Sequence, residues 1–243
     1  MPRLLVGTSG WVYPHWRGIF YPEDLPQKEW FSHYSRFFDT VEINYSFYQL
    51  PSRETFESWE QMAPPGFVFT VKANRFITHV KKLKDPQESV GRFYENLSGL
   101  GEKCAAVLYQ LPPHWKLNLD RLREFLEVVP KRYRLVFEFR DPLWLTEEVY
   151  LLLRNSGAVL CSADSPVFPS PRITTADFAF FRMHAGSGTS SPKYTKKELK
   201  KLTGEVGEHL EAGRDVFVYF NNDYKGFAID NALTLKDLVG RTE

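Results

Sequence analysis

The segment TVEINYSFY, residues 40–48, alternates apolar and polar side chains as a β-strand does. Val41, Ile43 and Tyr45 form one face of this predicted strand, and Glu42 and Asn44 form the other. An ordinary amphipathic strand would turn its polar face to water. Because the same arrangement recurs in other strand-like runs of this chain, the environment of Glu42 depends on how those runs assemble.

Eight strand-like runs follow one another along the chain, and segments of helical periodicity separate most of them. Asn118, Thr146 and Thr195 each stand where an N-cap residue would begin such a helix. Eight strands with intervening helices in about 250 residues are typical of a (β/α)8, or TIM, barrel. The runs begin at Leu4, Thr40, Phe67, Ala105, Arg134, Ala158, Phe178 and Asp215.

The alternative α/β fold is a doubly wound open sheet. It is disfavoured because GTSGW, residues 7–11, lacks the full glycine spacing of a dinucleotide-binding turn. After the sixth run, DSPVFPSPRITTADF (residues 164–178) has three prolines and no helical period, so we expect the helix there to be missing or reduced. No linker or change of composition divides the chain. The sequence therefore predicts one TIM-barrel domain over residues 1–243.

Composition indicates a globular protein without strong charge. Hydrophobic residues make up 43% and charged residues 25%, while the formal net charge is +1, so no large field favours nucleic acid or an anionic membrane. The start of the chain lacks the features of a secretory signal, and no apolar run reaches membrane-spanning length. Cys104 and Cys161 each lie in or beside an apolar run, which favours buried free thiols and a cytoplasmic protein.

In a barrel, each strand turns one face to the helices and the other to the barrel axis. If the apolar set faces the helices, polar side chains of several strands point inward, and they stand at the carboxyl ends where barrel enzymes place their chemistry. Gln110, Asp164 and Asn222 end three other strands in compatible phases. Asn44 and Asn74 also face inward. The expected shared pocket contains Glu42 together with Lys72, Glu138, Arg140, Asp164, Arg182 and His184.

Two interpretations of this polar interior compete. The charges could form a structural salt-bridge network, but burying so many ions is a poor route to stability, since apolar replacements are often as good. Clustering of titratable groups at one end of the barrel favours a ligand site instead. Single residues carry less weight, because an isolated His184 or Gln110 is compatible with a purely structural role.

The chain also resembles the YecE-like family, in seven motifs that occur in the family's order. They are GTSGWVYPHWRGIFYP, VEINYSFYQLP, FVFTVKANRFITH, YQLPP, VFEFRDPLW, FRMH and VYFNNDYKGFAIDNA, which together extend over nearly the whole chain. The resemblance implies a TIM barrel, and it implies no activity because the family's function is not established. It marks as motif positions Trp11, Glu42, Asn44, Lys72, His79, Gln110, Glu138, Arg140, Arg182, His184 and Asn222. This chain departs from the family's pattern after His184, where Ala185 precedes the expected glycine.

The leading functional hypothesis is an enzyme that acts by general acid/base chemistry on an anionic, sugar-like or nucleotide-like substrate. Arg140 and Arg182 would bind the phosphate or carboxylate group. Glu42 or Glu138 would serve as the base and His184 as the acid. The hypothesis leaves open whether the reaction is that of a hydrolase, a lyase or an isomerase. Further candidates are Lys72 and Asp164 for catalysis, and Trp11, Asn44, His79, Gln110, Trp144 and Asn222 for substrate binding.

Three alternatives use the same residues. Lys72 inside a barrel could form a Schiff base with a carbonyl substrate. Glu42 and Glu138 could be the paired carboxylates of a glycoside hydrolase, although that reading leaves the three cations unexplained. The same cations and rings could also hold a small molecule or a nucleic-acid end without turnover.

No cofactor is predicted from the sequence. A divalent metal held by Glu42, Glu138, Asp164 and His184 is conceivable, but three cations in the same pocket disfavour it. The expected partner is a small anionic ligand, with no membrane partner. Near-neutral charge argues against extended nucleic-acid binding but leaves room for one phosphate. The sequence yields no prediction of oligomeric state.

Overall fold

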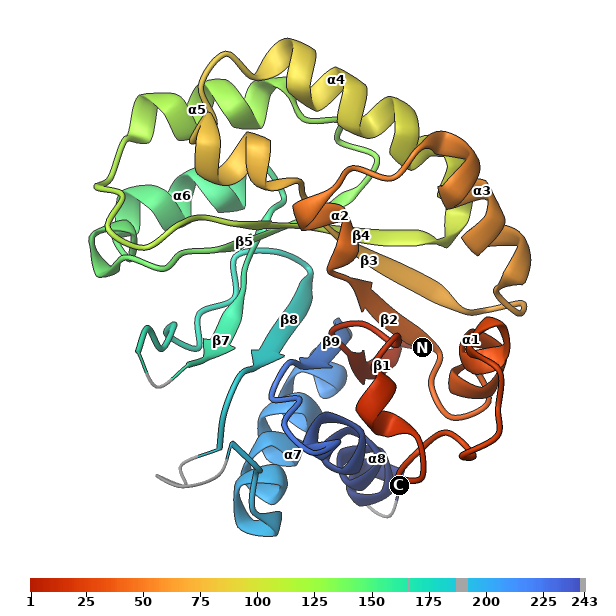
Figure 1. Cartoon of the computed structure of the whole chain (residues 1–243). Helices are drawn as coiled ribbons and strands as arrows, with labels where there is room; N and C mark the ends of the chain where they lie inside the picture. The colour runs from red at the N-terminus through yellow and green to blue at the C-terminus, as the bar shows by residue number, and fades with distance from the viewer. Residues whose placement is uncertain (166, 187–191, 241–243) are drawn as a thin grey trace.

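The chain has an α/β fold in which every paired strand is parallel to its neighbour. The computed structural model describes residues 1–165, 167–186 and 192–240 (Figure 1). The strands are β1 (Leu4–Thr8), β2 (Thr40–Ile43), β3 (Val68–Lys72), β4 (Cys104–Gln110), β5 (Arg134–Glu138), β6 (Val159–Leu160), β7 (Ser162–Asp164), β8 (Phe178–Met183) and β9 (Asp215–Phe220).

These strands form two sheets, ordered β1-β9-β8-β7 and β2-β3-β4-β5-β6. β6 and β7 correspond to one predicted strand that is interrupted at Cys161. At the other junction, β1 and β2 adjoin through a single bridge between Ser9 and Glu42. The Tyr34 hydroxyl also joins them, because it accepts from the Thr8 amide at 3.0 Å and lies 3.1 Å from the Thr40 carbonyl oxygen. The hydrogen-bonded ladders therefore form two sheets and not the closed ring that the sequence predicted.

Helices cover the outer faces of both sheets. In Figure 1, α3 to α6 lie outside the five-stranded sheet, and α7 and α8 lie beside the four-stranded one. Asn118, Thr146 and Thr195 do cap α5, α6 and α7. The helices are α1 (Trp30–Tyr34), α2 (Tyr45–Tyr48), α3 (Arg53–Met62), α4 (Pro86–Leu97), α5 (Leu119–Val128), α6 (Glu147–Asn155), α7 (Lys196–Glu211) and α8 (Phe227–Gly240). Shorter helical turns are η1 (Pro14–Trp16), η2 (Gln27–Glu29), η3 (Phe76–Val80), η4 (Ser98–Lys103) and η5 (Pro142–Trp144).

Two apolar clusters divide the core, and they fix which way each strand residue faces. The larger, outer cluster lies between sheets and helices and contains Val41, Ile43 and Phe137 as predicted. The smaller, inner cluster occupies the opposite faces of the strands and is formed by Leu5, Ala106, Leu108, Val136, Val159, Cys161, Ala163, Phe178, Phe180, Phe217 and Tyr219. Polar residues in phase with this inner cluster must point into the interior between the two sheets.

The prediction for Tyr45 was wrong. β2 ends at Ile43, and Tyr45 begins the short helix α2, where its side chain is 53% exposed. The strand alternation therefore stops before the aromatic run, because residues 45–48 form a helical turn with a different periodicity.

The proline-rich segment between β7 and β8 contains no helix in residues 165 and 167–177, the part that the structure describes. It is anchored instead by Thr175, whose hydroxyl accepts from the Leu160 amide at 2.8 Å and donates to the Ala158 carbonyl at 2.7 Å. This segment replaces the outer helix that β6 and β7 would otherwise carry.

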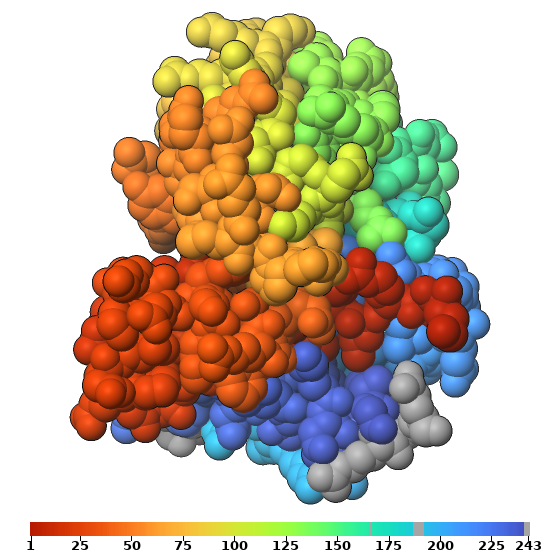
Figure 2. All heavy atoms as spheres, turned by 90° about the vertical axis from the view of Figure 1, so that its right-hand side faces the viewer, coloured from red at the N-terminus to blue at the C-terminus, as the bar shows by residue number. Residues whose placement is uncertain are grey.

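The N-terminal residues lie against the C-terminal helix. In Figure 2 the first residues, in dark red, border the blue helix α8. The Arg3 amide donates to Asp215 at the start of β9, and the Lys236 ammonium group on α8 donates to the Phe37 carbonyl oxygen. Both ends of the described chain therefore help to hold β1 between β9 and β2.

The junction between the sheets depends on a close backbone approach at Gly7. A Cβ atom there would clash with the Thr40 carbonyl oxygen and would lie 3.1 Å from the Tyr34 hydroxyl. We expect Gly7→Ala to destabilise the fold by about 2–3 kcal/mol, because overpacking must push β1 away from β2. Thermal unfolding should then show a midpoint lowered by roughly 5–10 °C.

Gly91→Ala is the matched control, because Gly91 lies within α4 and a Cβ there meets no atom within 4 Å. Alanine should stabilise that helix by about 0.5–1 kcal/mol. A midpoint for Gly7→Ala equal to or above the wild-type value would contradict the close junction.

Candidate functional site

The guanidinium group of Arg182 is the centre of the inner polar cluster. Arg182 lies on β8, two residues after Phe180 of the inner cluster, and its side chain is fully buried. Its Nε and Nη2 atoms donate to the two carboxylate oxygens of Glu42, at 2.9 and 2.7 Å. Its Nη1 atom donates to Glu138. One buried cation therefore binds two buried carboxylates from the other sheet.

Glu138 lies at the end of β5, and both of its carboxylate oxygens accept hydrogen bonds. Besides Arg182 it accepts from Gln110 Nε2 at 2.9 Å and from Arg140 Nε at 2.6 Å, and His184 Nε2 lies 3.5 Å away. Burial favours the neutral acid, but the charge of Arg182 and the His184 contact outweigh it and hold the pKa well below the ordinary 4.5. Glu138 is therefore a carboxylate at neutral pH.

Glu42 is similarly enclosed. Its Oε1 atom accepts from the Ser9 hydroxyl at 2.8 Å in addition to the Arg182 contact. Its side chain, like that of Glu138, is fully buried. The polar face of β2 is thus explained, because Glu42 points between the sheets and not into water.

Arg182, Glu42 and Glu138 together form a buried triad. A second layer of polar side chains lies above this triad and is less buried. The Arg140 Nη2 atom is 3.2 Å from His184 Nε2, and Asn221 Nδ2 is 3.1 Å from His184 Nδ1. Burial, together with the neighbouring arginines, lowers the pKa of His184 although Glu138 opposes the shift. His184 is therefore neutral at pH 7, and the positive charge of this layer comes from Arg140 and Lys72.

Lys72, at the end of β3, occupies an unusual position. Its side chain is 9% exposed, and its Nζ atom lies 4.1 Å from the centroid of the Phe47 ring. Within residues 1–165, 167–186 and 192–240, no carboxylate lies within ion-pairing distance of this amine. Burial and the nearby Arg182 lower its pKa to about 8, although Glu42 and Glu138 act in the opposite direction.

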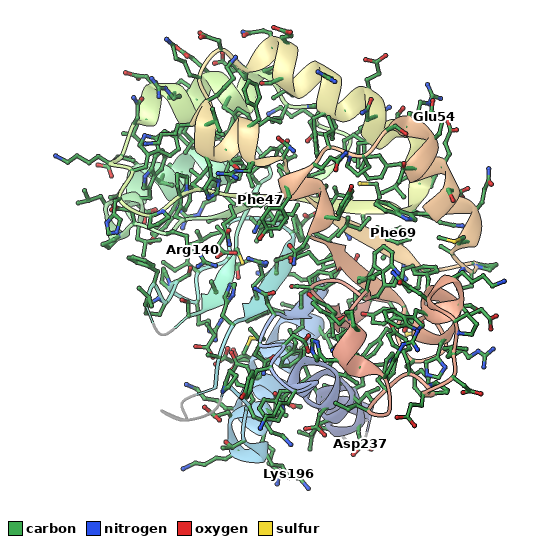
Figure 3. All side chains as sticks on the ribbon, in the orientation of Figure 1. Phe47, Glu54, Phe69, Arg140, Lys196 and Asp237 are labelled. Carbon is green, nitrogen blue, oxygen red and sulfur yellow. The ribbon has the colours of Figure 1, made fainter. Side chains whose placement is uncertain are left out.

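Figure 3 shows Phe47 and Arg140 near the centre of the molecule, whereas Glu54 and Lys196 lie at its periphery. His79 also contacts Phe47, at a centroid distance of 4.9 Å, and its Nδ1 atom is 2.9 Å from the Thr78 hydroxyl. Burial and then Lys72 lower the pKa of His79 to about 4. His79 thus lies beside the cluster as a neutral imidazole.

The structure does not bring Asp164 into this cluster. In β7 it is Ala163 that pairs with Arg182 and belongs to the inner cluster, so Asp164 faces outward, in register with Met183. There its carboxylate contacts the Tyr194 hydroxyl, whose pKa is raised by burial and then by Asp164. The expected phase was wrong by one residue, because the alternation runs unbroken through Cys161 and places Val159, Cys161 and Ala163 on the inner face.

Trp144 is also placed elsewhere. It is 1% exposed in the outer cluster, stacks on Phe139 at a centroid distance of 5.0 Å and donates to the Trp115 carbonyl oxygen at 2.6 Å. A ring with both of these contacts has no face left for a substrate. The position after the fifth strand suggested a stacking wall, but η5 folds this ring back over the helices' side of β5.

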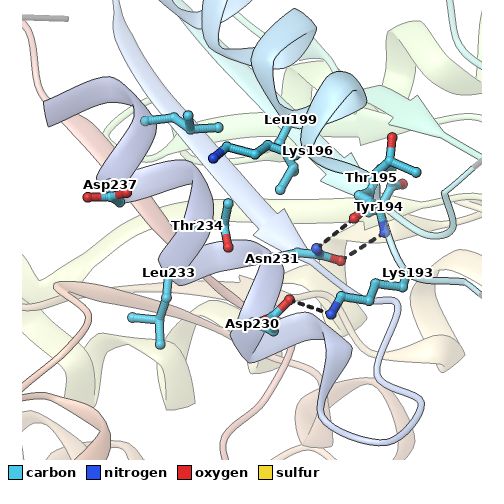
Figure 4. A pocket seen from close by; sticks show the side chains of 11 residues that line it. Lys193, Tyr194, Thr195, Lys196, Leu199, Asp230, Asn231, Leu233, Thr234 and Asp237 are labelled. Carbon is cyan, nitrogen blue, oxygen red and sulfur yellow. Dashed lines mark hydrogen bonds and ion pairs between the residues drawn. The ribbon is translucent and has the colours of Figure 1, made fainter. Parts of the chain in front are cut away.

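Asn222 stands one residue out of phase with the inner face of β9. Its Nδ2 atom donates to the Asn231 side chain at 2.9 Å and to the Pro192 carbonyl oxygen at 2.8 Å. Asn231 in turn accepts from the Tyr194 amide and donates to the Tyr194 carbonyl oxygen. Tyr194 and Asn231 border a cavity of about 690 Å³ between α7 and α8 (Figure 4). Asn222 therefore orders the segment that enters α7, away from the charged cluster.

Trp11 and Asn44 line a separate groove of about 450 Å³ at the ends of β1 and β2. Trp11 makes edge contacts with Phe31 and Trp59, which leaves it half-buried. Asn44 Nδ2 lies 3.4 Å from the Ser9 carbonyl oxygen. Asn44 thus adjoins the cluster through Ser9, whereas the ring of Trp11 packs against Phe31 and Trp59.

Sequence reasoning missed two residues that contact the cluster, Ser9 and Asn221. Ser9 and Asn221 continue the inner phase of β1 and β9, two residues beyond Gly7 and Tyr219, so extending the alternation would have found them. A pair that sequence reasoning also missed lies apart from these contacts: His15 Nε2 lies 2.8 Å from Asp223, whose other oxygen accepts from Trp16. No periodicity in the sequence indicates that pair.

The described residues contain neither a grouped metal-ligand set nor a membrane-spanning helix. No group of three or more His, Cys, Asp or Glu side chains there is arranged to hold a metal ion. No helix among them is long and apolar enough to cross a membrane.

Comparison with known proteins places these observations in a family. A family model described as "Protein of unknown function DUF72" matches residues 5–243. UPF0759 protein YunF of Bacillus subtilis (strain 168) is 26% identical over an alignment of 278 residues, covering 97% of this chain and 94% of that protein. UPF0759 protein YecE of Escherichia coli (strain K12) is 28% identical over 142 residues, 57% of this chain and 49% of that protein.

Solved structures agree with this match. The crystal structure of a DUF72 family protein from Thermotoga maritima MSB8 superposes with a TM-score of 0.87 at 35% identity, over 98% of this chain and 99% of that one. A DUF72 family protein from Enterococcus faecalis V583 gives a TM-score of 0.77 at 19% identity, over 99% of this chain and 98% of that one, a likeness of fold alone.

The buried triad predicts how the free energy of unfolding depends on pH. Arg182→Met leaves Glu42 without a charged partner and Glu138 with Arg140 alone, so we expect a loss of about 3–5 kcal/mol in the free energy of unfolding at pH 7. In the wild type the depressed pKa of Glu138 contributes stability that is present above pH 4.5 and is lost as pH falls below it. In the variant the carboxylates can take up protons at higher pH, so the difference between the two proteins should shrink between pH 7 and pH 4.

Urea unfolding at several pH values measures that difference. A triple variant, Glu42→Gln with Glu138→Gln and Arg182→Met, removes all three charges and should recover much of the loss. A constant difference over the pH range would show that the variant suffers from lost packing and not from unpaired carboxylates.

Proposed function

We propose, for a chain that belongs to the DUF72 family of proteins of unknown function, that it is an enzyme whose charged cluster binds a small anionic substrate. The observation that carries this proposal is a surplus of positive charge at the exposed side of the cluster. The ion pairs of Glu42 and Glu138 with Arg182 and Arg140 balance one another, which leaves the positive charge of Lys72 without a counter-charge in the described part of the chain, beside the partly exposed Arg140. An incoming carboxylate or phosphate would balance that surplus.

Arg140 supplies the donors for such an anion. Its Nε and Nη2 atoms contact Glu138 and His184, and its Nη1 atom has no hydrogen-bond partner in the parts of the chain that the structure describes. The side chain is 24% exposed, whereas Arg182 below it is fully buried. Arg140 is thus the anion-binding residue, and Arg182 is a positioning residue that orients the two carboxylates.

The proton-transfer roles follow from which groups still have a lone pair or a proton available to a substrate. Every oxygen of Glu42 and Glu138 already accepts from buried donors, so neither carboxylate is poised to take a proton from a substrate. His184 is neutral and partly exposed, and Lys72 has a pKa of about 8. These two groups therefore carry the acid/base chemistry, on a sugar-like or nucleotide-like body that bears the anion.

The same proposal includes the architecture of a (β/α)8 barrel, with β6 and β7 counted as one strand. It is supported by the inner cluster, which draws apolar residues from both sheets. The Cys161 amide bonds the Phe137 carbonyl oxygen at 2.8 Å, which continues the β5 edge toward β7. In such a barrel, the cluster stands at the carboxyl ends of the strands, where barrel enzymes hold their substrates.

The glycoside hydrolase alternative has less support. Its two carboxylates must reach a sugar and an attacking water, yet Glu42 and Glu138 are fully buried and share one guanidinium group. A binding protein without turnover remains the competing class. His184→Asn separates the two classes, because an enzyme would lose rate while keeping its ligand, and a binding protein has no rate to lose.

Thermal unfolding in the presence of anions tests the binding site. Inorganic phosphate, sugar phosphates and small carboxylates form the panel, and a ligand at a hundred times its dissociation constant should add about 2.7 kcal/mol. We expect at least one anion to raise the midpoint of the wild type and to have little effect on Arg140→Ala, each shift being measured from that protein's own unliganded midpoint.

Arg123→Ala is the matched control, because Arg123 is an exposed arginine on α5 that pairs with Asp120. It should respond to the anion as the wild type does. An equal response of Arg140→Ala would place any bound anion outside the cluster and contradict the proposal.

A further inference from the structure

The amine of Lys72 is largely buried and has no ion pair within the described residues, which anion binding alone does not require. We infer that this amine forms an imine with a carbonyl group of the substrate, which makes the substrate class an anionic aldehyde or ketone. This inference rests on the proposed anion site, since Arg140 would hold the carboxylate or phosphate of the same molecule.

The first support is the pairing of the charges around Lys72. Glu42, Glu138, Arg140 and Arg182 all take part in ion pairs of the cluster. The charges of all four act on the Lys72 amine, yet this amine has no ion pair or hydrogen bond within the described residues. An amine that served only to balance the two carboxylates would be expected to contact one of them.

The second support is the way the amine is held. Phe47 lies under it at 4.1 Å, and the Ser46 hydroxyl fixes the end of β3 against α2 because it bonds the carbonyl oxygens of Ile43 and Lys72, at 3.0 and 2.6 Å. The side chain is buried but not sealed, with 9% of its surface exposed. Such a site gives a carbonyl compound access to an amine in a defined position.

The third support is the protonation state. With a pKa of about 8, roughly a quarter of the Lys72 side chains are neutral at pH 7.5, compared with about one in a thousand for an ordinary lysine. Only the neutral amine has a lone pair with which to attack a carbonyl carbon. Burial and the two arginines therefore prepare a nucleophile, while Glu42 and Glu138 limit the shift.

The covalent step can be written with its atoms in balance. The lone pair of Nζ forms a bond to the carbonyl carbon, and a proton moves from nitrogen to oxygen to give a carbinolamine. The carbon–oxygen bond then breaks as one proton is taken up from solvent, so that water leaves and a protonated imine remains. The positive charge of that imine lies near Glu42 and Glu138, whose carboxylates stabilise it.

Reductive trapping tests the inference. The protein is incubated with glyoxylate, the smallest aldehyde that carries a carboxylate, and reduced with sodium borohydride, which adds hydride to the imine carbon and leaves a stable secondary amine. Peptide mass mapping should find Lys72 labelled at least about tenfold faster than Lys103 at pH 7.5. Lys103 is the internal control, because it is more exposed yet bound by Glu60 and two carbonyl oxygens.

The pH profile provides a second readout. Labelling of Lys72 should rise with a midpoint near pH 8, whereas labelling of exposed lysines should still be rising at pH 10. Lys72→Arg keeps the positive charge and should abolish the adduct at this position while retaining the anion-dependent thermal shift. Labelling of Lys72 no faster than that of Lys103 would overturn the inference.

A parallel reaction with acetaldehyde, which has no charge, separates this inference from the proposed anion site. If Arg140 holds the carboxylate, Arg140→Ala should slow the glyoxylate reaction but not the acetaldehyde reaction. Fast labelling by both aldehydes, unaffected by Arg140→Ala, would support the nucleophile and contradict the anion site. An anion-dependent thermal shift without labelling of Lys72 would support the anion site and contradict the imine.

Discussion

The bond network between Arg182 and the two carboxylates of Glu42 and Glu138 is the constraint on which the rest of the interior depends. Arg182 belongs to the four-stranded sheet, and both carboxylates belong to the five-stranded sheet, so these bonds join the two sheets across the interior. Removing Arg182 would leave the buried carboxylate of Glu42 without a charged partner, and that is more costly than replacing the whole charged group by apolar side chains. Geometry and chemistry are therefore linked in this protein, because the group that joins the sheets also determines the charge of the site.

That linkage gives the site two layers with different properties. The deeper layer is saturated, since Ser9, Gln110 and Arg140 supply the remaining donors to the carboxylates. The upper layer then carries an excess of positive charge. Burial first, and then the neighbouring cations, lower the pKa of Lys72 and of the two histidines. On the proposed function, a nearly neutral protein would present a local field for a small anion without attracting polyanions over its whole surface.

The high aromatic content has a mostly structural explanation. Trp16, Trp30 and Trp144 are buried in the outer cluster, where rings contact rings between the strands and the helices. Short helical turns and a proline-rich segment cover part of the sheets, and large side chains fill space that longer helices would otherwise occupy. Phe47 is an exception, because it lies against Lys72 and His79 in the upper layer.

Much of this protein could be predicted from the sequence, and the limits of prediction have physical causes. The alternation in β2, β3, β5 and β8 placed Glu42, Lys72, Glu138 and Arg182 on the inner face, because a strand with one apolar face against helices has no freedom to turn the other way. Prediction failed at the ends of strands and in the turns that follow them. Asp164 and Asn222 were each one residue out of the inner phase of their strands, and Trp144 folds back over the outer core within a short turn.

The sequence by itself therefore determined the strands, their facing and the family, since periodicity and motif order are local properties of the chain. Only the tertiary structure decided which polar side chains meet and in what state. Arg182 lies 140 residues from Glu42 and 44 from Glu138, and no local pattern states that one guanidinium binds both. Nor does any pattern state that Lys72 is left without a carboxylate partner, because pairing and pKa arise from distances in the folded interior that residues far apart in the chain create together.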